Sequence, residues 1–392
     1  MGFLKWLYLF FSSYVNLFER RVDKFFNRIK STDNIADIRE ELLKLMQENL
    51  IVLNVWLEKK FKGYKYLSKG VRKKMYADTE KIKQKFAEFC KNSGITKEVV
   101  SKFLDQFGIS YPTGDDEKIL YITQIMAFLA PGKYYHYIKT SSFGKLLRDP
   151  DKEKMEGDCN QIVTLYIYLY SLKFPLNDLK IKLLTEHVCL QFREIDIEAT
   201  AGQFAKYKEY EHVLRVTEII STNLLDIADF REQTSEISPR VILKSSQLAY
   251  AISSLRTLVE KNLKIAYTNM ALYSLSKNDI SSAEFFAEKA GDQQLLFNVY
   301  RNAATYYTER SNFTKALYYA QKSGNSSMIE AVKHNEAAYE YTKLSKKVAD
   351  VRTLNEAKDK KPIYQKMLVL AQRLGDTTIE HNLRDTIDKI SK

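Results

Sequence analysis

The last third of the chain repeats with a period of 33 residues, and this pattern restricts what it can fold into. Six positions agree between two copies without a gap: Ala271, Asp279, Ile280, Ala283, Ala287 and Ala290 in the first, and Ala304, Asn312, Phe313, Ala316, Ala320 and Ser323 in the second. Small side chains at fixed helical offsets let paired helices approach closely, so we expect stacked helix pairs here. A weaker third copy keeps Ala337 and Ala349, and residues 361–391 predict one more helix pair, with a charged outer face.

The composition favours helices in the rest of the chain as well. Six prolines and 13 glycines among 392 residues are few, which favours long helices over sheet and loop. The hydrophobic content of 45% is enough for sizeable cores. We therefore expect a mostly helical α+β protein with a small antiparallel sheet. The predicted segments are an amphipathic helix over 1–31, a helical region of unknown role over 32–110, a core with the sheet over 115–215, a helical connector over 216–261 and the repeats over 262–392.

The N-terminal segment is apolar and aromatic on one side and basic on others. Residues 3–18 are too few for a membrane span, which needs about 20 apolar residues, and Lys5 interrupts them. An apolar stripe at helical spacing continues to Ile29, with Arg20, Arg21, Lys24 and Arg28 on other faces. The pattern predicts one amphipathic helix, which either packs on the protein or lies on an anionic membrane surface.

The positive charge is concentrated in the first part of the chain. Residues 1–155 carry a net charge of +10, out of +12 for the whole protein. This excess indicates an acidic partner, such as an anionic lipid surface, although a solvated helical face gives the same pattern. No nucleic-acid-binding motif accompanies the basic residues, so we do not expect nucleic acid as a partner. Three cysteines are no disulfide framework and favour a reducing compartment. We expect a cytoplasmic protein, which could also attach peripherally to the membrane.

A cysteine stands at the predicted start of a buried helix in the middle of the chain. Gly157-Asp158-Cys159 precedes a run that is apolar on all sides, and Asp158 can cap the helix. The partial positive charge of a helix N-terminus stabilises a thiolate and lowers its pKa. Three strand-like runs follow at 179–184, 187–192 and 195–200. Cys159 therefore lies where a nucleophile would be expected.

The second and third of these runs carry a histidine and two carboxylates. A hairpin with its turn near Phe192 and Arg193 would set Glu198 opposite His187 and Asp196 opposite Cys189. We therefore predict a triad of Cys159 as nucleophile, His187 as base and Glu198 as the carboxylate that orients the imidazole, with Asp196 as the reserve.

Two other interpretations of these residues stay open. Cys159 could be a buried structural cysteine, because free cysteines are among the most buried residues. Cys159, His187 and Cys189 could also form a metal site, but no fourth ligand is evident and the spacing is not that of a known zinc site. No glycine-rich phosphate-binding loop is present. We expect neither a metal nor a cofactor.

The segment around Cys159 and His187 resembles the transglutaminase-like superfamily, which has the papain-like cysteine peptidase fold. Gly157-Asp158-Cys159 with its apolar helix is similar to the nucleophile helix of that family, and His187 with the alternating apolar residues after it is similar to its histidine strand. Glu198-Ala199-Thr200-Ala201-Gly202 takes the place of an element that carries aspartate in the family. Gln124 is the nearest upstream candidate for the family's oxyanion-binding side chain.

The resemblance extends into the repeats. A bacterial branch of this family joins such a core to C-terminal tetratricopeptide repeats, and residues 256–267 look like its connecting segment. The resemblance implies a transglutaminase-like core followed by a tetratricopeptide-like solenoid. It also implies a cysteine hydrolase or acyltransferase that acts on a peptide or protein amide, with repeats that recruit a protein partner. The alternative is a non-catalytic adaptor with a vestigial triad.

Overall fold

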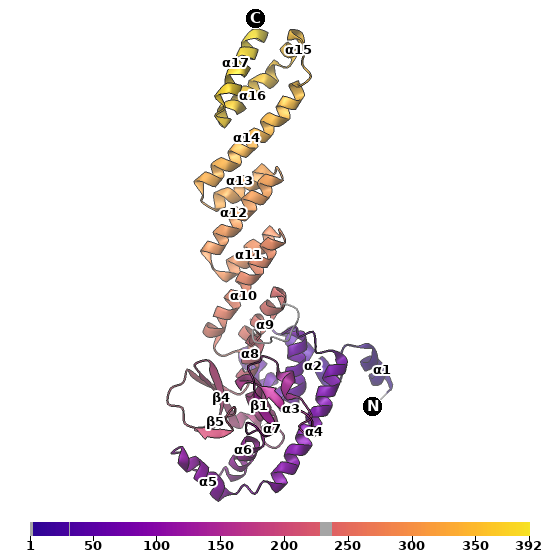
Figure 1. Ribbon diagram of the computed structural model, residues 1–392, viewed down its shortest axis with the longest axis vertical. Coiled ribbons are helices and arrows are strands. Elements are labelled where there is room, and N and C mark those ends of the chain that lie inside the picture. The colour runs from indigo at the N-terminus through magenta and orange to yellow at the C-terminus, as the bar shows by residue number, and fades with distance from the viewer. Residues whose placement is uncertain (1–2, 31, 228–236) are drawn as a thin grey trace. The chain divides into compact units, whose positions relative to one another are not determined.

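The computed structural model describes residues 3–30, 32–227 and 237–392, with side chains from Trp6 onward. The chain forms two compact units, Met1–Ala266 and Tyr267–Lys392. It is a mostly helical α+β protein with N-terminal helices, a small antiparallel sheet and C-terminal stacked helix pairs (Figure 1). The expected fold class is confirmed at this level. The parts of the predicted segments 1–31 and 216–261 that fall on residues 1, 2, 31 and 228–236 lie outside the described residues.

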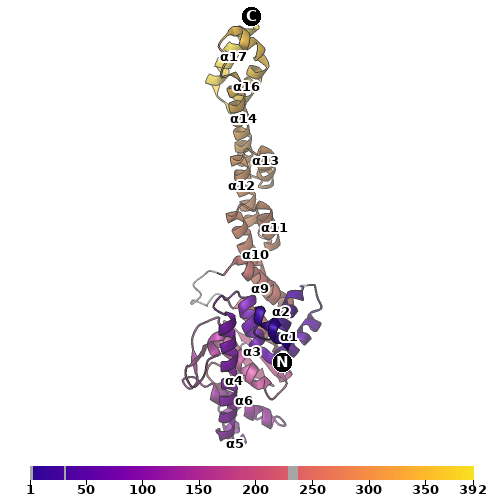
Figure 2. The same ribbon diagram turned by 90° about the vertical axis from the view of Figure 1, so that its right-hand side faces the viewer.

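Helices make up most of the first unit. Those before the sheet are α1 (Phe3–Phe11), α2 (Leu17–Arg28), α3 (Ile35–Lys60), α4 (Lys69–Asn92), α5 (Lys97–Gln106) and α6 (Asp116–Phe128). Helix α4 lies beside α6 in both views (Figures 1 and 2).

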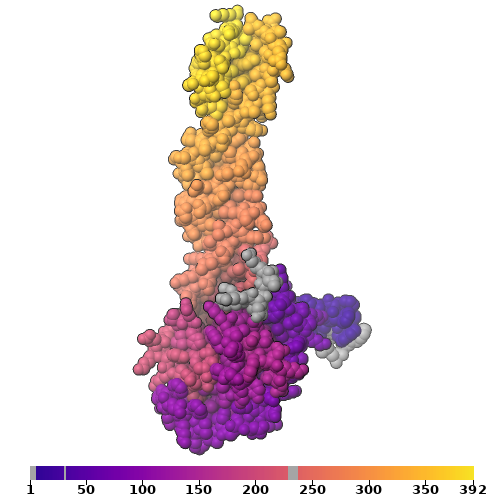
Figure 3. Space-filling model, in the orientation of Figure 1, coloured from indigo at the N-terminus to yellow at the C-terminus, as the bar shows by residue number. Residues whose placement is uncertain are grey.

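The prediction of one continuous N-terminal helix is wrong. Residues 12–16 separate α1 from α2, and α1 protrudes at the edge of the first unit (Figure 3). Asn16 caps α2 by accepting a hydrogen bond from the Glu19 backbone N–H at 2.9 Å. The fully buried Glu19 carboxylate in turn accepts a bond from the Arg72 guanidinium at 2.8 Å, and Arg72 also binds the Ser13 carbonyl at 2.7 Å. Arg72 of α4 thus holds both Glu19 of α2 and the backbone of the segment between α1 and α2, and these contacts stabilise the break between the two helices.

The sheet follows the central helix of the unit. Its order is β6-β5-β4-β3-β7, all antiparallel, with β3 (Leu179–Leu184), β4 (His187–Phe192), β5 (Ile195–Glu198), β6 (Gln203–Ala205) and β7 (His212–Arg215). The first two predicted strands lie at the expected residues, and the third ends two residues early. A separate parallel pair, which the sequence did not predict, joins β1 (Tyr135–Tyr137) to β2 (Met155–Gly157). Two short 3-10 helices are η1 (Phe143–Leu146) and η2 (Leu176–Asp178).

Helix α7 (Cys159–Ser171) occupies the centre of the first unit. Its apolar side chains are buried on all sides, as the sequence predicts, and Tyr170 packs near Phe192 of β4 with ring centroids 6.5 Å apart. Two more helices, α8 (Glu218–Leu225) and α9 (Pro239–Ile252), follow the sheet. Buried apolar residues from Val22 to Val259 form one hydrophobic core. The segments expected over 32–110, 115–215 and 216–261 thus pack together around α7.

The second unit consists of stacked helix pairs. It begins within α10 (Arg256–Ser276) and continues through α11 (Ile280–Ala290), α12 (Gln293–Glu309), α13 (Phe313–Lys322), α14 (Ser326–Val348), α15 (Leu354–Asp359), α16 (Lys361–Leu374) and α17 (Thr377–Ser391). The pair predicted over residues 361–391 is α16 and α17. Neighbouring helices of the unit lie side by side in both views (Figures 1 and 2).

The 33-residue period is visible in the packing and in the caps. Ala283 and Ala316 are both fully buried. Asp279 caps α11 and Asn312 caps α13 through the same backbone N–H three residues on. The third copy is incomplete, because α14 continues unbroken to Val348 and leaves Ala349 exposed after its end.

Candidate functional site

Cys159 is the first residue of α7, and its surroundings fix this helix start. The Asp158 carboxylate accepts a hydrogen bond from the Asn160 backbone N–H at 3.0 Å and forms a capping box with Gln161. A Cβ atom at Gly157 would lie 3.0 Å from side-chain atoms of Gln161 and Leu146, so glycine permits the chain to enter the helix this closely. The Cys159 side chain is half-buried at the helix N-terminus.

His187 opens β4 and lies between the thiol and a carboxylate. Its Nε2 is 2.7 Å from Oε2 of Glu198. A hydrogen bond with the Cys159 thiol is the largest cause that raises the pKa of His187, followed by the bond with Glu198, and together they raise it to about 10. Because Nε2 is engaged by Glu198, Nδ1 is the ring nitrogen left for the thiol. The structure therefore brings Cys159, His187 and Glu198 together.

Glu198 is held as an anion. Its Oε2 accepts a hydrogen bond from the Tyr207 hydroxyl at 2.7 Å, and its Oε1 accepts bonds from the backbone N–H and the hydroxyl of Thr200. Burial alone would raise the pKa of Glu198, but the bonds from His187, Thr200 and Tyr207 outweigh it and lower the pKa to about 2. A carboxylate with all these partners keeps one orientation and one charge state.

The predicted hairpin register is wrong by two residues, although the predicted acid is the one at His187. The structure pairs Gln191 with Asp196, which places the turn at Arg193 and Glu194. Arg193 adopts a left-handed conformation with φ of 55°, which the sequence gives no reason to expect. Glu198 is then a diagonal neighbour of His187 across the strands, and the long glutamate side chain spans this separation.

Asp196, the reserve acid, is not brought to His187. Its carboxylate binds the buried Lys182 ammonium at 2.7 Å, the Gln191 amide at 3.1 Å and the Tyr207 backbone N–H at 2.8 Å. In the observed register Asp196 faces Gln191, four residues along β4 from His187, and is therefore too far from the imidazole. Its role is to neutralise Lys182 inside the sheet.

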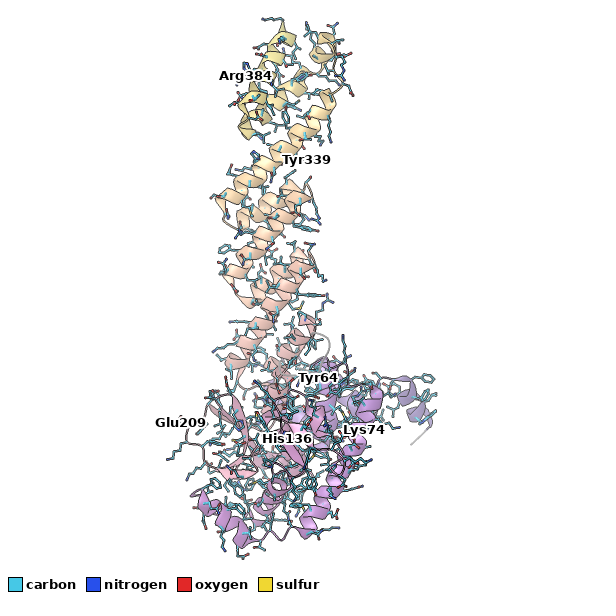
Figure 4. All side chains as sticks on the ribbon, in the orientation of Figure 1. Tyr64, Lys74, His136, Glu209, Tyr339 and Arg384 are labelled. Carbon is cyan, nitrogen blue, oxygen red and sulfur yellow. The ribbon has the colours of Figure 1, made fainter. Side chains whose placement is uncertain are left out.

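Tyr207 is a site residue that the sequence analysis missed. It lies in the loop of residues 206–211, which joins β6 to β7 and whose outer part is marked by Glu209 in Figure 4. The Lys182–Asp196 pair binds both backbone groups of Tyr207. Lys182 donates to the Tyr207 carbonyl at 3.1 Å, and Asp196 accepts from the Tyr207 backbone N–H. The hydroxyl is thereby aimed at Glu198. A tyrosine in a polar loop carries no periodic signal by which it could have been found.

Two carboxyl groups, those of Asp158 and Asp226, lie beside the start of α7. Burial, followed by the charge of Asp226, raises the pKa of Asp158 to about 7. Asp226 accepts hydrogen bonds from the side-chain amides of Asn160 at 3.3 Å and Gln161 at 2.9 Å. The residue that caps α7 therefore changes its charge near neutral pH.

The remaining sequence candidates lie apart from this arrangement. Cys189 is fully buried, and this burial raises the pKa of its thiol far above the usual range. Burial likewise raises the pKa of Cys90 to about 11. The Gln124 amide donates to the Cys90 carbonyl and the Ser93 hydroxyl, so it does not serve as an oxyanion donor at Cys159. Among the described residues, no cluster of three His, Cys, Asp or Glu side chains could hold a metal ion.

Comparisons with known proteins add nothing to this geometry. No family model, no curated protein and no solved structure matches the chain. Within the described residues, none of the helices has both the length and the apolar character needed to cross a membrane.

Proposed function

We propose that the protein is a transglutaminase-like cysteine hydrolase or acyltransferase that acts on an amide of a peptide or protein. The observation that supports this most is the position of the His187 ring, between the Cys159 thiol and the Glu198 carboxylate. A His187 pKa of about 10 keeps the imidazole protonated at neutral pH, and an adjacent imidazolium favours the thiolate form of a cysteine. The residue order and the resemblance of residues 140–205 to the family agree with this chemistry.

The reaction follows from the three roles. The Cys159 thiolate attacks the amide carbonyl and forms a tetrahedral intermediate. His187 gives its proton to the leaving amine, so the C–N bond breaks and a thioester remains on Cys159. Water or a second amine then attacks the thioester, loses a proton to His187 and releases the acyl group. Water gives hydrolysis, and an amine gives transfer or crosslinking.

The second unit supplies the partner surface in this proposal. Its helix pairs have the tetratricopeptide-like period, and such solenoids present extended surfaces for protein or peptide ligands. Exposed aromatic side chains include Phe285 on α11, Tyr318 on α13 and Tyr339 on α14, the last marked in Figure 4. These side chains also support the second candidate function, a non-catalytic adaptor. We place the protein in the cytoplasm, where its three thiols stay reduced.

The test is a search for products that depend on Cys159. The protein is incubated with denatured cellular proteins and a biotin-labelled primary amine, and the resulting peptides are identified by mass spectrometry. We expect cleaved or amine-labelled peptides with the wild type and none with Cys159→Ala. Cys90→Ala is the matched control and should keep the activity, since Cys90 lies away from His187.

Two results would overturn the enzymatic proposal. Products that persist in Cys159→Ala would assign the chemistry to other residues. A complete lack of products with the wild type, together with retention of peptides by the intact protein, would favour the adaptor.

A further inference from the structure

Helix α1 presents a cluster of exposed aromatic side chains. Trp6 and Phe10 stack with ring centroids 5.5 Å apart, and Phe10 meets Phe11 edge-on at 5.2 Å. Trp6 is 53% exposed, Tyr8 38%, Phe10 64% and Phe11 79%. Phe25 and Phe26 of the neighbouring α2 are buried, whereas these four side chains are exposed. We call Trp6, Tyr8, Phe10 and Phe11 the aromatic patch.

Basic side chains from two other helices adjoin the patch. The Arg20 guanidinium of α2 lies 4.9 Å from the Tyr8 ring centroid. The Lys69 ammonium of α4 binds the carbonyls of Leu9, Phe10 and Ser12 at the end of α1. One turn further along each helix, Lys24 and Lys73 are exposed and have no acidic partner among the described residues. The patch therefore lies beside cations that no described carboxylate neutralises.

The size and composition of the patch indicate what covers it. Fully exposed aromatic side chains offer roughly 150–250 Å² each, so the four partly exposed ones present roughly 400 Å². A stable dimer buries about 800 Å² on each partner, which is about twice that area. Aromatic side chains next to lysine and arginine are typical of helices that lie at a membrane interface, where rings enter the headgroup region and cations meet anionic lipids.

We propose that the aromatic patch inserts into an anionic lipid surface and attaches the protein peripherally. The helix is too short to span a bilayer, and its end is tied to the protein by Lys69, so it reaches only the interface. Helix α1, which carries the patch, lies on the opposite side of the first unit from β4 and β5 (Figure 1). Lipid attachment would therefore leave the candidate site accessible. This inference is independent of the proposed chemistry, because it involves none of the site residues.

The test uses the full-length protein with vesicles of phosphatidylcholine, with and without phosphatidylserine, at low and high salt. We expect co-sedimentation only with phosphatidylserine, at least about tenfold weaker at high salt. The double variant Phe10→Ser/Phe11→Ser should lose about tenfold or more of the binding at low salt. Both side chains are mostly exposed, so the variant should fold. Phe103→Ser on α5, which is 46% exposed, is the matched control and should bind as the wild type does.

A charge variant separates the two parts of the attraction. Lys24→Glu/Lys73→Glu should weaken binding and reduce its salt dependence, while the aromatic variant should keep the salt dependence of its residual binding. Equal binding by the wild type and Phe10→Ser/Phe11→Ser would overturn the proposal. So would a wild type that ignores vesicles but forms a dimer that the double variant abolishes, because a second copy would then cover the patch.

Discussion

At the residue scale, the site depends on how firmly Glu198 holds His187. Three of the donors to Glu198 come from Thr200 and Tyr207, so the carboxylate cannot turn away from the imidazole without losing buried hydrogen bonds. Such bonds to a charged group contribute about 1.5–3 kcal/mol each. Single substitutions around His187 should therefore have measurable effects on Cys159.

The first prediction concerns Glu198 itself. Glu198→Gln removes the negative charge beside His187, so the imidazolium should be less populated at neutral pH and Cys159 should be less reactive. The loss of one charged hydrogen bond corresponds to about 10- to 100-fold slower alkylation of Cys159 by iodoacetamide at pH 7. Glu194→Gln, an exposed acid in the same hairpin, is the control and should alkylate at the wild-type rate. Equal slowing in both variants would show that the effect is not that of the orienting carboxylate.

The second prediction concerns Tyr207 as a positioning residue. Tyr207→Phe removes only the hydroxyl that donates to Glu198, so Cys159 alkylation should slow by about tenfold, less than in Glu198→Gln. Tyr210→Phe serves as the control, because Tyr210 is 52% exposed in the same loop and contacts Lys182 instead. If Cys159 in Tyr207→Phe is alkylated at the wild-type rate across the pH range, Thr200 and β5 position Glu198 without the Tyr207 hydroxyl.

The third prediction is the pH dependence of stability. The pKa of His187 rises from 6.5 to about 10 on folding, so the folded protein binds this proton more tightly than the unfolded chain. The resulting stabilisation is complete below pH 6.5 and is lost as the pH rises toward about 10. The difference in unfolding free energy between the wild type and His187→Gln should shrink over this interval. Tryptophan fluorescence in urea follows the first unit alone, because both tryptophans, Trp6 and Trp56, belong to it. A difference that grows with pH would contradict the raised pKa.

At the scale of helices and strands, most of the predicted elements followed from periodicity and composition. The strands at 179–184 and 187–192 and the helix at Cys159 follow from apolar runs of the right length, which local patterns do reveal. The register depended on a left-handed Arg193, and the break after α1 depended on a buried contact with Arg72, 53 residues beyond Glu19. Both depend on tertiary structure, so the local pattern could not show them.

The fourth prediction concerns the helix pairs. Ala316 is fully buried, so Ala316→Leu should overpack α13 and destabilise the second unit by about 1–3 kcal/mol. Ala349→Leu is the matched control, because this alanine of the incomplete third copy is exposed after α14 and should tolerate the change. Hydrogen exchange of backbone amides in α12 and α13 measures the effect. Unchanged exchange rates in Ala316→Leu would show that α13 and its neighbouring helices accommodate the larger side chain without a loss of stability.

At the scale of the whole molecule, the candidate site and the stacked helix pairs belong to different units. The first unit, Met1–Ala266, has α7 at its centre and contains all four site residues, Cys159, His187, Glu198 and Tyr207. The helix pairs lie within Tyr267–Lys392. The aromatic patch of α1 lies at another edge of the first unit. A measurement on Cys159 in the full chain therefore reports on the candidate site directly, whatever the repeats or α1 bind.

The central claim is that Cys159 is a nucleophile activated by His187. The most direct test is the rate of alkylation of each cysteine in the folded wild type between pH 5 and pH 9, followed by peptide mass spectrometry. Cys159 should react at least about tenfold faster than Cys90 at pH 7, and His187→Gln should remove this difference, because an adjacent imidazolium makes a cysteine a better nucleophile. Cys90, with its pKa raised to about 11, and the buried Cys189 should react slowly and speed up with pH. A Cys159 rate that rises with pH in parallel with Cys90 and is unaffected by His187→Gln would contradict the account.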